Sequence, residues 1–168
     1  MEPSVTIITT AAKDPDQFEG MLLTERRERS VGWKKFPLRS GVYLDAFLVS
    51  ATDSDFGVFG SAEEEVDAEG IKVRTRLIVS ESIPQILPML MTMVEEKPDE
   101  TARALVKHGG GTADVVRVTE ALTSGAWPSG NDPAEEAAAF AHQLLTYARL
   151  AEETLKGICL EYRGTSVE

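Results

Sequence analysis

The chain has 168 residues, 42% of them hydrophobic and 27% charged, and its 28 acids against 17 bases give a formal net charge of -11. This composition is typical of one globular domain and argues against wholesale disorder, and no apolar run approaches the ~20 residues that a membrane helix needs. An acidic surface repels phosphate backbones and attracts cations or basic protein surfaces, so we expect no nucleic-acid partner and no membrane association.

The negative charge is concentrated in one part of the sequence. Residues 1–40 hold seven Lys/Arg and six Asp/Glu, whereas residues 41–168 hold ten and 22. Between Asp45 and Glu69 there are eight acids and no base. The N-terminus does not have a basic segment followed by an apolar one, and the single cysteine, Cys159, fits a reducing compartment. We therefore expect a cytoplasmic protein with one domain over residues 1–168, frayed at 1–3 and 164–168.

The first half of the sequence has mostly strand-like patterns. Val5–Thr10 is β-branched throughout, and Asp14-Pro15 starts a predicted helix over about residues 15–29. Further strands are predicted over 42–51, 56–59 and 71–79. In the last of these, the alternation places Ile71, Val73, Thr75, Leu77 and Val79 on a buried face, and Lys72, Arg74 and Arg76 on a wet basic face.

The second half has helical spacing. Ser82 and Gln85 have capping-box spacing before an apolar helix over about 83–94, which Pro88 should kink and which we expect to be central. A second helix opens at Pro98 and ends at a left-handed Gly109; a third is capped by Thr112 and ends at Gly125. Asp132-Pro133 starts the longest helix, predicted to reach about Gly157 with an apolar stripe that includes Ile158.

These elements predict an α+β fold. We expect a small antiparallel sheet of three to four strands, mostly from the N-terminal half, joined as a simple meander. Four to five helices, with a long C-terminal one, are expected to cover it.

Two acidic segments are candidate binding sites. Asp53, Asp55 and Glu64 match positions one, three and twelve of a calcium-binding loop, but Gly57 and Val58 stand at positions five and six, so an acidic turn is the favoured interpretation. The densest negative segment contains Glu63, Glu64, Glu65, Asp67 and Glu69. It is interpreted either as a self-repelling hairpin tip or as a docking surface for a basic partner, with Asp53 and Asp55 nearby.

A basic stretch with interleaved aromatics precedes the acidic half. It contains Arg26, Arg27, Arg29, Trp33, Lys34, Lys35, Phe36 and Arg39. Grooves that bind single-stranded nucleic acid use such mixtures, but the acidic remainder of the chain disfavours that role. We expect instead a solvated helix end and loop that pairs with the acidic half, with a protein-binding edge as the alternative.

The remaining chemical groups give no strong motif. The glycines of 109–111 precede a helix but have neither a preceding strand nor the lysine of a phosphate-binding loop, so they are interpreted as a helix stop and a linker. His108 and His142 have no metal-ligand spacing, and Cys159 has no recognisable catalytic partner. Trp127 stands in a loop, where it either anchors an interface or closes the helical cluster.

The function predicted from these features is binding to a basic protein partner, without catalysis, cofactor or metal. Inhibitors, immunity or antitoxin proteins, dedicated chaperones and adaptors of bacterial or phage type work in this way. The alternative is a small enzyme or ligand-binding protein with a pocket between the sheet and the 83–94 helix. These features do not predict the oligomeric state, and a homodimer is one of the alternatives.

Overall fold

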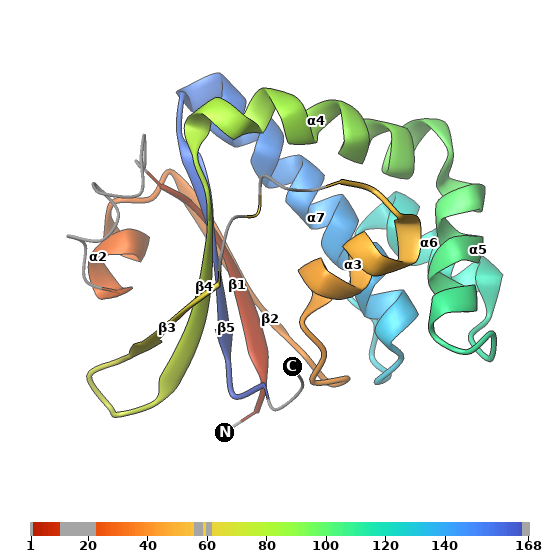
Figure 1. Cartoon of the computed structure of the whole chain (residues 1–168), viewed down its shortest axis with the longest axis horizontal. Helices are drawn as coiled ribbons and strands as arrows, with labels where there is room; N and C mark the ends of the chain where they lie inside the picture. The colour runs from red at the N-terminus through yellow and green to blue at the C-terminus, as the bar shows by residue number, and fades with distance from the viewer. Residues whose placement is uncertain (1, 11–22, 56–58, 60–61, 166–168) are drawn as a thin grey trace.

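The structure, a computed structural model, describes residues 2–10, 23–55, 59 and 62–165. Five antiparallel strands form one sheet in the order β2-β1-β5-β4-β3 (Figure 1). The strands are β1 (Ser4–Thr10), β2 (Gly32–Pro37), β3 (Glu63–Val66), β4 (Lys72–Ile78) and β5 (Gly157–Arg163). The predicted α+β class is confirmed, but the strand count of three to four is wrong. The C-terminal strand β5 inserts between β1 and β4, so the sheet is not a simple meander.

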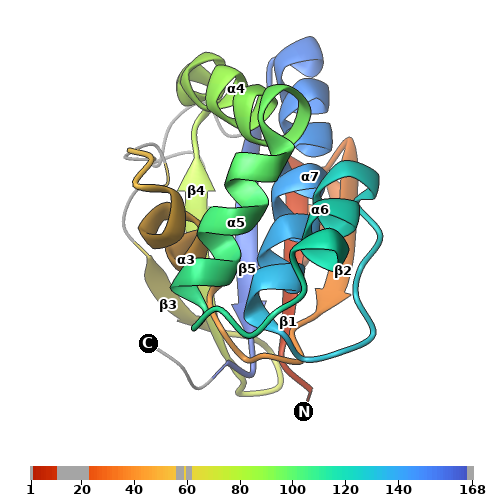
Figure 2. The same ribbon diagram turned by 90° about the vertical axis from the view of Figure 1, so that its right-hand side faces the viewer.

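The described residues form six helices on the two faces of this sheet, more than the four to five that the sequence predicted. They are α2 (Leu23–Glu28), α3 (Leu44–Thr52), α4 (Ile83–Met91), α5 (Pro98–His108), α6 (Val115–Ser124) and α7 (Pro133–Thr154). Helices α3 to α7 cover one face, which we call the inner face, and α2 lies on the other, the outer face (Figures 1 and 2). The inner face supplies the strand side of the main core, with Val5, Ile7, Ile78, Ile158, Leu160 and Tyr162.

The central helix is α7, not the 83–94 helix that the sequence predicted. It contacts β1, β5 and every other helix of the inner layer. Its alanines from Ala137 to Ala139 are all fully buried, so this part of the helix lies inside the core. The predicted start is confirmed, because Asp132 accepts a hydrogen bond from the Glu135 N–H at 3.1 Å.

The end of α7 differs from the prediction. The helix stops at Thr154, and Leu155 takes the left-handed conformation (φ 56°) with its side chain 78% exposed. Helix stops of this kind usually have glycine, so a leucine at this position carries no recognisable stop signal. The predicted apolar stripe therefore continued to Ile158, which belongs to β5.

The segment 42–51, predicted as a strand, forms α3. Leu44 and Leu48 are both buried, one helical turn apart, and Asp45 is buried beside them. Asp45 forms an ion pair with Arg76 of β4, and its N–H donates to the Tyr162 hydroxyl at 3.0 Å. A short apolar run in a sequence fits either a strand or a buried helix. In the structure this run is helical, and its Asp45 contacts both β4 and β5.

Val73 and Thr75 of β4 are buried, as predicted, but they lie on the outer face of the sheet, and the opposite face of β4 is not the solvent-exposed basic face that the sequence predicted. Ile78 lies in the main core, and Arg74 and Arg76 share its inner face, where each contacts α3 or the residue before it. The Arg74 guanidinium stacks over the Tyr43 ring at 4.6 Å, and Arg76 pairs with Asp45. The predicted wet basic face is therefore partly covered by α3.

The connections around α4, α5 and α6 also correct three details. Ser82 makes no side-chain capping bond at the start of α4. Pro88 within this helix is exposed, and a π-helical segment, Thr92–Glu96, follows the helix. Gly109 ends α5 with φ -79°, so it is not left-handed. Asp114 rather than Thr112 caps α6. The expected stop at Gly125 is confirmed, at φ +73°.

Some predictions fall partly or wholly outside the described residues. Of the helix predicted over 15–29, the described part is α2. The strand predicted over 56–59 has only Phe59 among the described residues, buried in the core. The expected fraying concerns residues 1 and 166–168 among others, which lie outside the described part.

Candidate functional site

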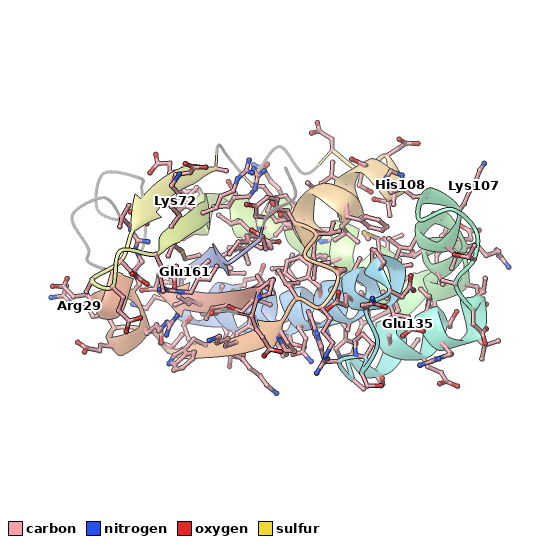
Figure 3. All side chains as sticks on the ribbon, turned by 90° about the horizontal axis from the view of Figure 1, so that it is seen from below. Arg29, Lys72, Lys107, His108, Glu135 and Glu161 are labelled. Carbon is pink, nitrogen blue, oxygen red and sulfur yellow. The ribbon has the colours of Figure 1, made fainter. Side chains whose placement is uncertain are left out.

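The outer face of the sheet has a row of polar side chains where an apolar layer would be expected. On this face Glu161 of β5 lies in register with Thr6 of β1 and Thr75 of β4. Apolar side chains lie beside them: Ile8, Cys159 and Leu77 form a small cluster, and Val73 of β4 is fully buried on the same face. Figure 3 shows Glu161 among the strands, well inside the molecule.

Helix α2 contacts this face through arginines. The Arg26 side chain is 1% exposed and donates two parallel hydrogen bonds to Glu65 of β3, each 2.7 Å long. Its Nη1 atom also lies 3.9 Å from Glu161 Oε2. Burial by itself would lower the pKa of Arg26, but the Glu65 hydrogen bonds and the nearby acids raise it, so the guanidinium stays charged.

Glu161 is the most deeply placed acid of the cluster, with 0% exposure. Three arginines surround it: Arg27 at 3.4 Å, Arg163 at 3.8 Å and Arg26 at 3.9 Å. Burial raises the pKa of Glu161, and the arginines oppose that rise. Its Oε2 atom accepts no hydrogen bond from the described residues. We call Arg26, Arg27, Glu65, Asp67, Glu161 and Arg163 the outer-face charge cluster.

The β3–β4 hairpin is attached to the same cluster at its turn. Asp67 Oδ1 accepts hydrogen bonds from the Glu69 and Ile71 N–H groups, both 2.9 Å, and Oδ2 pairs with Arg163. The Ile71 N–H lowers the pKa of Asp67 most, and Arg163 and the Glu69 N–H lower it further, against the effect of desolvation. The hairpin is therefore fixed at its strand by Glu65–Arg26 and at its turn by Asp67–Arg163.

The predicted acidic residues are divided by the structure into three groups. Glu65 and Asp67 pair with arginines inside the molecule. Glu63, Glu64 and Glu69 are exposed on the hairpin, and no described residue pairs with their carboxylates. We call these three the free hairpin acids.

Asp53 and Asp55 form the third group and do not lie on the hairpin. Asp53 caps the end of α3 in the left-handed conformation, and Asp55 follows it. Figure 1 separates this end of α3 from the hairpin turn. The calcium-loop pattern also continues into residues 56–58, which lie outside the described part. Within the described part, no three His, Cys, Asp or Glu side chains are grouped to hold a metal ion.

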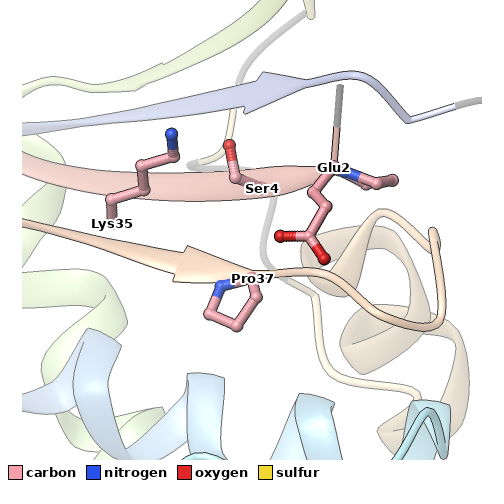
Figure 4. A pocket seen from close by; sticks show the side chains of 5 residues that line it. Glu2, Ser4, Lys35 and Pro37 are labelled. Carbon is pink, nitrogen blue, oxygen red and sulfur yellow. The ribbon is translucent and has the colours of Figure 1, made fainter.

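Most residues of the basic stretch lie on two elements, helix α2 and strand β2. Arg26 and Arg27 pair with acids of the later half, as expected. The following segment is not a loop, because Gly32–Pro37 forms the edge strand β2 beside β1. Lys34 and Lys35 are exposed there, and Phe36 points into the core. Lys35 lines a pocket of about 450 Å³ together with Glu2, Pro3, Ser4 and Pro37, and we call it the Lys35 pocket (Figure 4).

The other candidate groups, the cysteine, the histidines and Trp127, are buried or contact neighbouring parts of the fold. Cys159 is fully buried, and burial raises the pKa of its thiol well above the usual value. His142 Nδ1 is 2.9 Å from the Leu122 carbonyl, and His108 packs edge-on against Phe47. Trp127 stacks on Phe36 and donates to the Pro37 carbonyl at 2.8 Å, which favours the closing role over an interface anchor.

The side chains of α4 that face the sheet, where the alternative site was predicted, contribute to the main core. Ile83, Ile86 and Leu90 of α4 belong to the main core, together with Met93 of the π-helical segment. The Lys35 pocket lies elsewhere, by the first residues of β1 and the end of β2.

Comparison with known proteins gives no assignment: no family model, no curated protein and no solved structure matches this chain. In the described part of the chain, none of the helices combines the length and apolar character that crossing a membrane requires. The site residues therefore have to be interpreted from their geometry and chemistry.

Proposed function

We propose that the protein is a non-enzymatic binding module that docks a basic surface of a protein partner on the β3–β4 hairpin. The observation that carries this proposal is the contrast within the hairpin. Glu65 and Asp67 hold it against the sheet, while the exposed Glu63, Glu64 and Glu69 form no ion pair with a described residue. Inhibitors, immunity proteins, chaperones and adaptors are the protein classes that such a surface suits.

A fixed acidic hairpin has two advantages as a docking surface. Its residues are already ordered, so binding loses less conformational freedom than it would with a mobile tip. Like charges gathered on one projection also speed the encounter with an opposite surface and disfavour partners of the same sign.

The hairpin also offers contacts beyond charge. Val66 is 63% exposed among the acids and provides an apolar contact. Among the described residues β3 pairs only with β4, so its other backbone edge suits an extended segment of a partner. Charge would then set the association rate and selectivity, and the apolar and backbone contacts would supply affinity.

The test compares two variants with the same change in net charge. The hairpin variant is E63Q/E64Q/E69Q, and the control is E120Q/E152Q/E153Q, which neutralises three exposed acids on α6 and α7. Each variant and the wild type are immobilised and exposed to an extract of the source organism, and any captured protein is identified. The association rate of that protein with each variant and with the wild type is then measured at low and high salt.

The proposal requires a basic protein that the wild type and the control bind alike. The hairpin variant should associate about tenfold more slowly at low salt, with a smaller difference at high salt. Circular dichroism establishes that both variants fold. Equal association by the hairpin variant and the wild type would remove the hairpin from the binding surface.

A further inference from the structure

Among the side chains that the structure describes, helix α2 contacts the outer face through arginines, which meet acids and, for Arg27, the Trp33 ring at 5.1 Å. Its described inward side chains are Arg26 and Arg27, which meet Glu65 and Glu161. Buried ion pairs of this kind are poor stabilisers compared with apolar packing, because both charges lose their hydration. An interface built this way is better suited to specific recognition than to permanent attachment.

The charge balance of the cluster depends on α2. With α2 in place, three arginines (Arg26, Arg27 and Arg163) face three acids (Glu65, Asp67 and Glu161). Without the two arginines of α2, the same face has three acids and one arginine, a net charge of -2. That face would then continue the negative surface of the free hairpin acids.

Arg26 also leaves part of the acidic site unused. It satisfies Glu65 with two hydrogen bonds, but it stays 3.9 Å from Glu161. Glu161 is fully buried, and its Oε2 atom accepts no hydrogen bond from the described residues. Because a buried carboxylate oxygen without a donor is costly, the site has capacity for a guanidinium placed more deeply than that of Arg26.

We propose that Glu65 and Glu161 form a binding site for an arginine side chain, which Arg26 occupies within the chain and which an arginine of the basic partner takes over. This inference rests on the proposed function, since it names the side chain that the acidic surface recognises. Arginine is favoured over lysine because its planar group donates parallel hydrogen bonds to a carboxylate, as Arg26 does to Glu65. Helix α2 then acts as an internal competitor.

Because Arg26 competes with the partner's arginine for the same site, the partner must bind strongly enough to displace Arg26. A group tethered in the same chain has an effective concentration in the millimolar range, so a weak ligand alone opens only a small fraction of molecules. The partner's apparent affinity is reduced by the fraction in which α2 is docked. Loss of Arg26 should therefore make the site easier to occupy.

Cys159 reports whether α2 is docked. It is the chain's single cysteine, it is fully buried on the outer face, and Arg26 lies close enough to influence its thiol. Its reaction with a thiol reagent is expected to be slow while α2 covers the face. Arginine amide is added to the wild-type protein at increasing concentration, with lysine amide at the same ionic strength as the control.

The expected result is labelling that is several-fold faster with arginine amide than with lysine amide. R26Q should label fast without any ligand, whereas R149Q, which breaks the exposed pair with Glu95, should label like the wild type. Equal rates with the two amides in the wild type, or slow labelling in R26Q, would overturn the inference.

A thermal melt gives the second measurement. Arginine amide should raise the melting temperature of R26Q more than those of the wild type and R149Q, because only R26Q has an empty site. If R26Q does not fold, R26K keeps the positive charge without the parallel donors and takes its place. No selective rise in the variant that folds would also contradict the arginine site.

The two proposals fail in different ways. If arginine amide does not bind but the hairpin variant loses its partner, the inference about Arg26 falls and the proposed function stands. If arginine amide binds but the free hairpin acids prove irrelevant to capture, the proposed function falls and the arginine site remains.

Discussion

Two glutamates that pair with arginine, one with a buried arginine and one with an exposed arginine, allow the cost of breaking a pair in the outer-face charge cluster to be measured. Glu65 binds Arg26, whose side chain is 1% exposed, whereas Glu95 binds Arg149, and these two are 45% and 48% exposed. The substitutions E65Q and E95Q make the same chemical change. We expect E65Q to destabilise the fold strongly and E95Q to have little effect.

The magnitude follows from what each substitution leaves behind. Removing one partner of a fully buried pair costs about 3–5 kcal/mol, because the other charge remains buried. Glu65 is itself 29% exposed, so water can partly compensate, and we expect a loss of about 2 kcal/mol. With a urea m-value of about 2 kcal/mol/M, the unfolding midpoint of E65Q should fall by about 1 M. Exposed pairs contribute little, so E95Q should keep the wild-type midpoint.

The assay is equilibrium unfolding in urea, followed by far-UV circular dichroism, with the slope checked for two-state behaviour. Cys159 labelling in the absence of urea separates local release of α2 from global destabilisation, since E65Q should label faster than E95Q. Equal midpoints for E65Q and E95Q, together with equal labelling, would refute the claim that this buried pair holds α2.

Two further predictions concern the turn of the hairpin and a helix stop. The pKa of Asp67 is lower in the folded protein than its unfolded value of about 3.9. The contribution of Asp67 to the stability of the fold is therefore present above about pH 3.9 and is lost as the pH falls through the lower folded pKa. The difference in stability between the wild type and D67N should be largest near pH 7 and vanish in acid. Urea unfolding as a function of pH measures this, and a pH-independent difference would contradict it. G125A places a Cβ against the His142 ring, 2.9 Å from its Cγ atom, whereas G41A, at a similar positive φ, meets nothing within 4 Å. G125A should therefore cost about 1–3 kcal/mol more than G41A in the same assay, and equal costs would show that the ring moves freely.

The sequence predicted elements whose signals are local. The strand that contains Val5–Thr10, the start of α7 at Asp132 and the stop at Gly125 each depend on a few neighbouring residues. The errors arose where two structures share one local pattern. The apolar run of α3 fits a strand equally well, and Leu155 stops a helix in a conformation that usually belongs to glycine.

Strand β5 did have a signal that could have been found. From Ile158 to Arg163, apolar residues alternate with Cys159, Glu161 and Arg163, a period of two that a helix does not produce. The alternation was concealed because the segment follows α7 directly. Recognising it would have predicted a strand with charged residues on one face.

The sequence predicted that the basic stretch pairs with the acidic half, but not which residues form the outer-face charge cluster. Its contacts join Arg26 to Glu65, 39 residues away, and Arg27 to Glu161, 134 residues away. Such pairs depend on strand order and register, which the sequence pattern did not fix. The acidity of the hairpin was visible, but which of its acids have internal partners was not.

The two innermost contacts of the sheet have a consequence for how the chain reaches its native state. Strand β1 pairs on one side with β5, from Ser4 opposite Arg163 to Thr10 opposite Gly157. These partners are separated by most of the polypeptide, and pairing over such separations is slow because a very large loop must close first. While the ribosome is still adding residues, β1 can associate only with β2, and a chain that stops before β5 would leave β1 and β4 with unsatisfied edges. We therefore expect the native sheet to assemble after synthesis has passed Arg163, in one late step that depends on the last strand.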